Sequence, residues 1–249
     1  MSVSCFVSDI HLGLDYKDPK AREAKFVSFL EQLPSNLTDL FLLGDIFDFW
    51  YEYKNVIPNK FTRTLGALAK LSDRGVRIHY FNGNHDIWTY RYFQNELGIE
   101  ILDKPKIFEL NGKRFFLGHG DGILDDSKGY KFLKGIFTNK FIQFCFSALH
   151  PRWAFLFGNN WSKHNRLTHT MSEKEFAELK SNITERALQW CAEYQKNAQN
   201  ERIDYFILGH YHIPIRTEVE GGEFFMLSDW IHHPDYILFD ESGLTYLSY

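Results

Sequence analysis

Five short polar motifs, each directly after a short apolar run, constrain the fold of this 249-residue chain most strongly. They are Asp9-Ile10-His11, Gly44-Asp45-Ile46-Phe47-Asp48, Gly83-Asn84-His85-Asp86, Gly118-His119-Gly120-Asp121 and Gly209-His210-Tyr211-His212. The first four recur at intervals of 36, 39 and 35 residues, counted from Asp9, Asp45, Asn84 and His119. Each interval is about the length of one β-α unit. Because the carboxyl ends of strands in an α/β sheet converge on one edge, we expect the motifs to form one site.

Apolar, β-rich runs alternate with amphipathic stretches through the amino-terminal half. The apolar runs lie at residues 3–8, 40–43 and 76–81, and an amphipathic stretch follows each of them, at 20–33, 60–74 and 88–97. This alternation predicts β-α units around a covered sheet. From Ile107 onward the pattern favours antiparallel strands, and Asn111-Gly112 predicts a two-residue hairpin turn. Strand-like runs return after residue 205, and Ser172 with Glu175 predicts the start of a helix. We therefore predict an α/β fold with two stacked sheets, interrupted once.

The interruption spans residues 127–166, forty residues without Asp or Glu that carry seven Lys and Arg and ten of the 43 aromatic residues. The rest of the chain has a formal charge of −11. We predict a core of residues 1–126 and 167–249 and an inserted helical segment at 127–166. Its aromatic residues follow helical spacing among lysines, which is typical of a membrane-surface helix or of a lid over an apolar ligand. Packing of these aromatics on the core is the alternative; stacking on single-stranded nucleic acid fits the compact apolar runs less well.

Composition narrows the class of protein further. A hydrophobic content of 44% excludes disorder as the main state, and a net charge of −4 disfavours a uniformly basic nucleic-acid binder. Three cysteines without a C-x-x-C pair indicate a reducing compartment and no cysteine zinc site. The first residues lack the basic start of a signal peptide, and no 18-residue window is apolar throughout. We expect a cytosolic enzyme or adaptor.

The motifs supply carboxylates, imidazoles and a carboxamide but no thiolate, which suits Mn²⁺, Fe²⁺ or Zn²⁺ better than Ca²⁺. If Asp45 bridged two cations, they would lie about 3.5–4 Å apart, as in sites that activate water for phosphoryl transfer. Taken singly, Asp45 or Asn84 would more often cap a turn, and His11 or His119 would more often be a buried histidine. Caps and buried histidines would have to coincide at all five motifs, so they explain the pattern poorly. The histidines outside the motifs are expected to be structural or at the surface.

The pattern D-x-H, G-D-x-x-D, G-N-H-D, G-H and G-H-x-H, complete over residues 9–212, resembles the calcineurin-like metallophosphoesterase superfamily. The resemblance implies a four-layer α/β/β/α sandwich and two divalent metal ions. One metal would be held by Asp9, His11, Asp45 and His212, and the other by Asp45, Asn84, His119 and His210. His85 would act beside the substrate phosphate, with Asp86 orienting it, and Asp48 would support a ligand histidine from behind.

The segments S-D-I-H-L-G, G-D-I-F-D-F-W and H-G-D-G, with the inserted lid, are similar to the UDP-2,3-diacylglucosamine diphosphatase family of lipid A biosynthesis. The resemblance implies Mn²⁺-dependent hydrolysis of UDP-2,3-diacylglucosamine to UMP and 2,3-diacylglucosamine 1-phosphate. It also implies peripheral attachment, through residues 127–166, to the cytoplasmic face of a Gram-negative inner membrane. Implied substrate contacts are Asn84, His85, Asp126, Ser162, Lys163, Asn165, Arg166 and His210. Many members of that family read G-N-R-D where this chain has G-N-H-D. Another phosphoester substrate, or a metal-binding adaptor without activity, remains the alternative.

Overall fold

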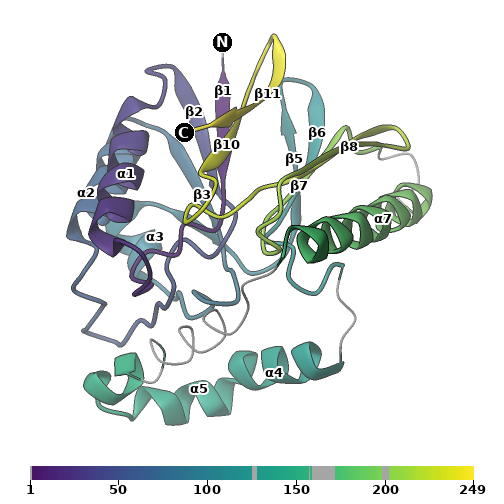
Figure 1. Ribbon diagram of the computed structural model, residues 1–249. Helices are drawn as coiled ribbons and strands as arrows, with labels where there is room; N and C mark the ends of the chain where they lie inside the picture. Colours follow the sequence, from purple (N-terminus) through teal and green to yellow (C-terminus); the bar gives the residue numbers. More distant parts are fainter. Residues whose placement is uncertain (1, 125–127, 157, 159–171, 198–201) are drawn as a thin grey trace.

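The computed structural model describes residues 2–124, 128–156, 158, 172–197 and 202–249, and it contains two sheets packed face to face (Figure 1). The first sheet has the strand order β11-β10-β1-β2-β3-β4. Its strands are β1 (Val3–Val7), β2 (Leu37–Leu42), β3 (Arg77–Phe81), β4 (Glu100–Leu102), β10 (Asp235–Asp240) and β11 (Gly243–Ser248). Strands β1 to β4 are parallel, as the β-α spacing predicts, and β10 and β11 add an antiparallel edge.

The second sheet has the order β5-β6-β7-β9-β8. Its strands are β5 (Lys106–Leu110), β6 (Lys113–Leu117), β7 (Tyr205–Leu208), β8 (Ile215–Val219) and β9 (Gly222–Met226). The hairpin predicted between β5 and β6 is confirmed: Asn111 and Gly112 have φ angles of 47° and 73°, the positive values that a type I′ turn needs. Strands β6, β7 and β9 are parallel, so their carboxyl ends also share one edge.

Helices cover both outer faces, which gives the four layers expected from the sequence. Helices α1 (Pro19–Gln32), α2 (Thr62–Asp73) and α3 (Tyr92–Leu97) pack on the first sheet, and α7 (Glu173–Asn197) packs on the second. The capping box at the start of α7 is confirmed, because Ser172 N donates to Glu175 Oε2 at 2.8 Å. Between the sheets, Phe6 stacks on Phe41 and on Phe115 with ring centroids 4.9 and 5.4 Å apart. Part of the aromatic excess therefore forms this inter-sheet core.

The inserted segment contributes α4 (Lys128–Thr138), α5 (Lys140–Ser147) and a helical turn at residues 151–156, which lie apart from the sheets (Figure 1). Core side chains donate hydrogen bonds to its main chain: Trp88 Nε1 to Phe137 O at 2.9 Å and Tyr51 OH to Gln143 O at 3.3 Å. Residues 127, 157 and 159–166 lie outside the described residues, so the boundaries of the insertion stay a prediction. No helix within the described ranges is long and apolar enough to cross a membrane.

The aromatic residues of the insertion divide between two environments. Phe137 and Phe146 pack against Trp88, with ring centroids 5.5 and 4.8 Å away. Phe141 and Phe144, in contrast, are 73% and 71% exposed. Packing on the core therefore holds for some of these aromatic side chains, and the role of the exposed ones as a membrane-surface helix or a lid stays a prediction.

Candidate metal centre

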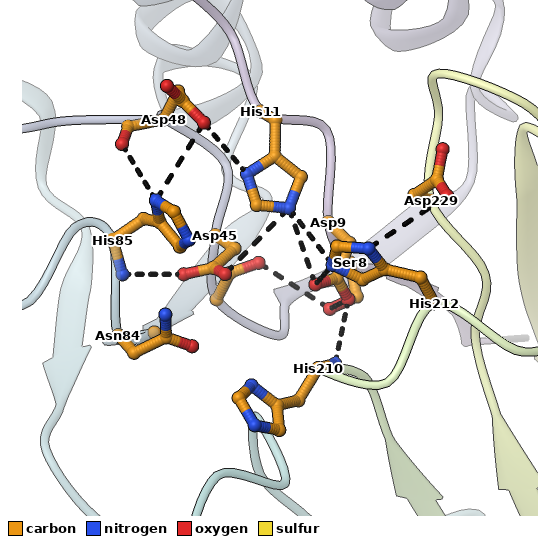
Figure 2. Close-up of polar contacts among 12 residues, drawn as sticks. Ser8, Asp9, His11, Asp45, Asp48, Asn84, His85, His210, His212 and Asp229 are labelled. Carbon is orange, nitrogen blue, oxygen red and sulfur yellow. Dashed lines mark hydrogen bonds and ion pairs between the residues drawn. The ribbon is translucent and has the colours of Figure 1, made fainter. Parts of the chain in front are cut away.

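The five motifs meet at the carboxyl ends of strands from both sheets, as their spacing predicts. Figure 2 labels residues of all but the motif at 118–121. Asp9 and His11 follow β1, Asp45 and Asp48 follow β2, Asn84 and His85 follow β3, His119 follows β6, and His210 and His212 follow β7. The loops are joined by main-chain hydrogen bonds, for example from His11 N to Asp45 O at 2.9 Å. The structure thus brings together residues that lie up to 203 positions apart in the printed numbering.

Asp9, His11, Asp45 and His212 form a compact group whose ligand atoms all lie within 4.8 Å of one another. His212 Nε2 lies 3.1 Å from Asp9 Oδ1 and 3.2 Å from His11 Nε2, and His11 Nε2 lies 3.8 Å from Asp45 Oδ2. Asp9 and His11 are fully buried. These four residues are the set that the sequence resemblance implies for one metal ion.

The geometry of this group fits a divalent cation. Ligand atoms about 2.0–2.2 Å from a tetrahedral or octahedral ion are separated by about 3–3.6 Å from one another, close to the distances observed here. The buried Asp9 Oδ1 accepts no hydrogen bond from the described residues, since its contact with His212 lacks hydrogen-bond geometry. A buried carboxylate oxygen in this situation is costly unless a cation offsets its charge.

A second group adjoins the first through Asp45. His119 Nε2 lies 3.5 Å from Asp45 Oδ2 and 3.2 Å from Asn84 Oδ1. The His210 ring lies beside the His119 ring with centroids 5.1 Å apart. Asp45 Oδ2 thus lies within 4 Å of both His11 and His119. This is the location required of a carboxylate shared by two cations.

Neighbouring charges and burial together shift the pKa values of the carboxylates and imidazoles in the two groups. Burial acts to raise the pKa of Asp9, but the neighbouring imidazoles of His11 and His212 outweigh it and lower the pKa well below the usual range. Burial lowers the pKa of His210 to about 4 and keeps this ring neutral. The charge of Asp45 raises the pKa of His119 above its ordinary value, against the effect of burial.

The backbone at these positions is unusual. Asp9, His11, Asp45, His210 and His212 all have positive φ angles, between 51° and 77°. Such values are rare outside glycine, and they cluster where a function requires strained geometry. Gly83 permits the close approach of two loops, because a Cβ at this position would lie 2.2 Å from Asp45 Oδ1.

Comparison with known proteins agrees with this geometry. The sequence profile of calcineurin-like phosphoesterases matches residues 4–214. The chain belongs to this family. A UDP-2,3-diacylglucosamine hydrolase of Porphyromonas gingivalis is 32% identical over 256 residues, covering 96% of this chain and 95% of the relative. One from Aeromonas salmonicida is 35% identical over 145 residues, covering 58% of this chain and 55% of the relative. The structure of an archaeal phosphodiesterase aligns over 99% of both chains at 12% identity, with a TM-score of 0.48.

In this phosphoesterase, His85 lies at the edge of the centre and is oriented by Asp48. His85 Nδ1 lies 3.0 Å from Asp48 O and 3.7 Å from Asp48 Oδ1, and His85 N donates to Asp45 Oδ1 at 2.9 Å. The carboxylate of Asp48 also lies 3.4 Å from His11 Nδ1, on the side of the ring away from Asp9. Asp48 therefore contacts a candidate ligand histidine, as expected, and holds His85 in addition.

The prediction that Asp86 orients His85 is wrong. The Asp86 carboxylate is fully buried and accepts hydrogen bonds from Ile46 N and Gly83 N, each at 2.8 Å, and also contacts the Tyr80 hydroxyl. Burial, and then the charge of Asp45, raise its pKa. Asp86 thus fixes the loop that carries Asp45. Neighbours in the sequence point in opposite directions here, because the turn after β3 sends Asp86 inward.

Five of the substrate contacts implied by the sequence, Asp126, Ser162, Lys163, Asn165 and Arg166, lie outside the described residues. Sequence reasoning also missed two residues of the phosphoesterase centre. Ser8 Oγ donates to Asp9 Oδ2 at 2.5 Å, and the buried Asp229 faces His212. A signal for Asp229 was present, since Ser228-Asp229 follows the apolar end of β9 as Ser8-Asp9 follows β1.

Proposed function

We propose that this phosphoesterase hydrolyses the pyrophosphate bond of UDP-2,3-diacylglucosamine to give UMP and 2,3-diacylglucosamine 1-phosphate, a reaction of lipid A biosynthesis. The observation that carries the proposal is a largely apolar pocket lined by residues that directly follow His11 and Asp48 in the chain. The relative from Porphyromonas gingivalis supports it, because that protein is named for this substrate and aligns over nearly the whole of both chains.

The pocket has a volume of about 370 Å³, within the range of small-molecule sites. Leu12 and Gly13, which follow His11, form one wall, and Phe49, which follows Asp48, forms another. Pro151 and Phe155 of the inserted segment close it. A substrate phosphate at the metal centre would thus have an apolar surface next to it, which suits an acyl chain better than a hydroxylated sugar or a peptide backbone.

We propose two divalent cations, with Mn²⁺ as the first choice and Fe²⁺ or Zn²⁺ also compatible with nitrogen and oxygen donors. Asp9, His11, Asp45 and His212 would hold one, and Asp45, Asn84, His119 and His210 the other. When bound, such a pair supplies an activated water and offsets the negative charge of the phosphates. His85, with Nδ1 directed to Asp48, has Nε2 left to stabilise charge on the reacting phosphate. Asn84 and His210 would contact the same phosphate.

We further propose that the inserted segment contacts an anionic bilayer, at the cytoplasmic face of the inner membrane. Phe132, Phe141, Phe144 and Trp153 are at least 60% exposed. Lys140 and Arg152 are exposed on the same segment, and no acidic residue occurs between positions 127 and 166. Apolar side chains among cations are favourable at the surface of a negatively charged membrane.

Hydrolysis of UDP-2,3-diacylglucosamine and of its deacylated analogue with Mn²⁺ tests the proposal. We expect UMP from the acylated substrate, loss of turnover in EDTA, and kcat/KM at least about 10-fold lower for the deacylated analogue, whose apolar contacts are missing. Equal rates for the two would contradict the lipid assignment. Activity on a chromogenic phosphodiester alone would favour a different phosphoester substrate, and activity on none would favour the adaptor.

A further inference from the structure

A buried carboxylate lies behind one of the candidate metal ligands. Asp229 is 5% exposed, and its Oδ2 lies 3.9 Å from His212 Nδ1 (Figure 2). The opposite nitrogen of the same ring, His212 Nε2, lies 3.1 Å from Asp9 Oδ1. His212 is thus placed between two carboxylates, one inside the candidate metal centre and one outside it.

The loop that carries Asp229 is bound to the centre by its own main chain. Trp230 N donates to Asp9 O at 3.0 Å, and Ser228 Oγ donates to His212 O at 3.3 Å. Asp229 Oδ1 accepts hydrogen bonds from Ile231 N and His232 N, each at 2.8 Å. These contacts fix the carboxylate, so its distance from His212 is a property of the folded loop and not of one side-chain rotamer.

The Asp229 carboxylate faces an imidazole on each side: its Oδ2 lies 3.9 Å from His212 Nδ1, and its Oδ1 lies 3.1 Å from His232 Nδ1. An ionised carboxylate facing Nδ1 favours the tautomer that carries its proton there and leaves Nε2 with a free lone pair. At 3.9 Å the attraction is electrostatic, and it strengthens when a cation at Nε2 makes the ring more positive.

We propose that Asp229 is a positioning residue that holds His212 in the tautomer and orientation needed to bind a metal ion through Nε2. This inference rests on the proposed metal binding. It concerns only the cation held by Asp9, His11, Asp45 and His212, because Asp229 contacts none of the residues proposed for the other cation among the described contacts.

His232 provides a matched control. Its Nδ1 lies 3.1 Å from Asp229 Oδ1, but its side chain is 48% exposed and belongs to the outer side of the loop. Replacing His232 by Gln removes a partner of Asp229 while the carboxylate behind His212 stays. Replacing Asp229 by Asn removes the charge but keeps an oxygen that can accept from Ile231 N and His232 N.

Calorimetric titration with Mn²⁺ at one fixed pH tests the proposal. We expect two binding events in the wild type, a loss of about 10- to 100-fold in affinity at one of them in Asp229→Asn, and no change in His232→Gln. Urea unfolding of the metal-free proteins verifies that the variants are folded. If Asp229→Asn does not fold, Asp229→Glu, which keeps but displaces the charge, should show a smaller loss at the same site.

Several outcomes would overturn the inference. Asp229 would have only a local structural role if folded Asp229→Asn bound Mn²⁺ with wild-type affinity at both sites. The same conclusion would follow if the variant lost affinity equally at both sites, or if His232→Gln lost as much affinity as Asp229→Asn. Failure of the wild type to bind Mn²⁺ at all would instead reject the proposed function. The two failures are therefore distinguishable.

Discussion

His11 Nε2 and His212 Nε2 lie 3.2 Å apart, although 201 residues separate them in the sequence. His11 follows β1 of the first sheet and His212 follows β7 of the second, so their distance depends on how the two sheets pack. That packing is made by aromatic rings between the sheets, such as Phe6 of β1 against Phe115 of β6. The inter-sheet core therefore sets the geometry of the candidate metal centre as directly as the motifs do.

Replacing Gly83 by Ala should disrupt the centre. The added Cβ would lie 2.2 Å from Asp45 Oδ1 and 2.5 Å from Asp45 N, so the two loops must separate. We expect Mn²⁺-dependent turnover to fall at least about 100-fold, because a shift of about 1 Å in a catalytic group has effects of this size. Stability should also fall, by about 1–3 kcal/mol. Steady-state kinetics and urea unfolding measure both effects.

Gly66 supplies the control for that substitution. It lies within α2, and a Cβ there would meet nothing within 4 Å. Gly66→Ala should leave turnover unchanged and stabilise the protein by about 0.5–1 kcal/mol, since alanine loses less backbone entropy in a helix. Similar turnover in the two variants would show that close contact at Gly83 does not matter to the centre.

A pH dependence of stability is expected from Asp235. This buried residue accepts hydrogen bonds from Ser228 N and contacts the Tyr246 hydroxyl, and burial raises its pKa from 3.8 to about 7. The folded state therefore binds the proton more tightly than the unfolded state. Its contribution to stability is complete below about pH 4 and is lost as pH rises to about 7, with a slope of up to about 1.4 kcal/mol per pH unit.

Asp235→Asn removes this titration. The free energy of unfolding of the wild type, relative to that of the variant, should decrease between about pH 4 and pH 7 and stay constant above that range. Urea unfolding of the metal-free proteins across these values measures the difference. A constant difference over the whole range would mean that Asp235 titrates with its ordinary pKa.

The order of elements could be predicted because it is encoded locally. Each interval between Asp9, Asp45 and Asn84 corresponds to one strand and one helix. The turn at Asn111-Gly112 follows from the preference of these two residues for positive φ angles. The prediction for Asp86 failed because its direction depends on a turn and on amide groups from another loop. Asp229 was missed because Ser228-Asp229, although it follows a strand as Ser8-Asp9 does, matches none of the five motifs, and only the fold places it behind His212.

The inserted segment shows a second limit of sequence reasoning. Helical spacing groups Phe137, Phe141 and Phe144 on apolar positions, but it does not say which of them face the core. The structure packs the half-buried Phe137 against Trp88 and leaves Phe141 and Phe144 exposed. Sequence periodicity indicates that a helix has an apolar face. Which surface packs against that face depends on the tertiary structure.

Replacing both Phe141 and Phe144 by Ser should weaken membrane binding. Each ring is more than 70% exposed, and burying such a side chain in the membrane interface contributes about 1.5–3 kcal/mol. We expect co-sedimentation with vesicles of anionic phospholipid to fall at least about 10-fold. Hydrolysis of a chromogenic phosphodiester should not change, because neither residue belongs to the proposed metal centre.

The matched control is Leu188→Ser on α7, another exposed apolar side chain at 38% exposure. It should bind vesicles as the wild type does. Equal binding by all three proteins would show that the exposed rings of the insertion do not contact the bilayer. A similar loss in both variants would point to general surface hydrophobicity.

Substitutions at His85 separate two roles for this residue. A sugar phosphate is already a weak base, so its departure needs little proton donation, and we expect His85 to act mainly by stabilising charge. His85→Gln should lower kcat by at least about 100-fold, with Mn²⁺ affinity preserved. His85→Arg, which places a positive group at the edge of the centre, should recover kcat to within about 10-fold of the wild type. Turnover of UDP-2,3-diacylglucosamine and calorimetric Mn²⁺ titration measure the two quantities. An Arg variant as slow as the Gln variant would show that the imidazole transfers a proton.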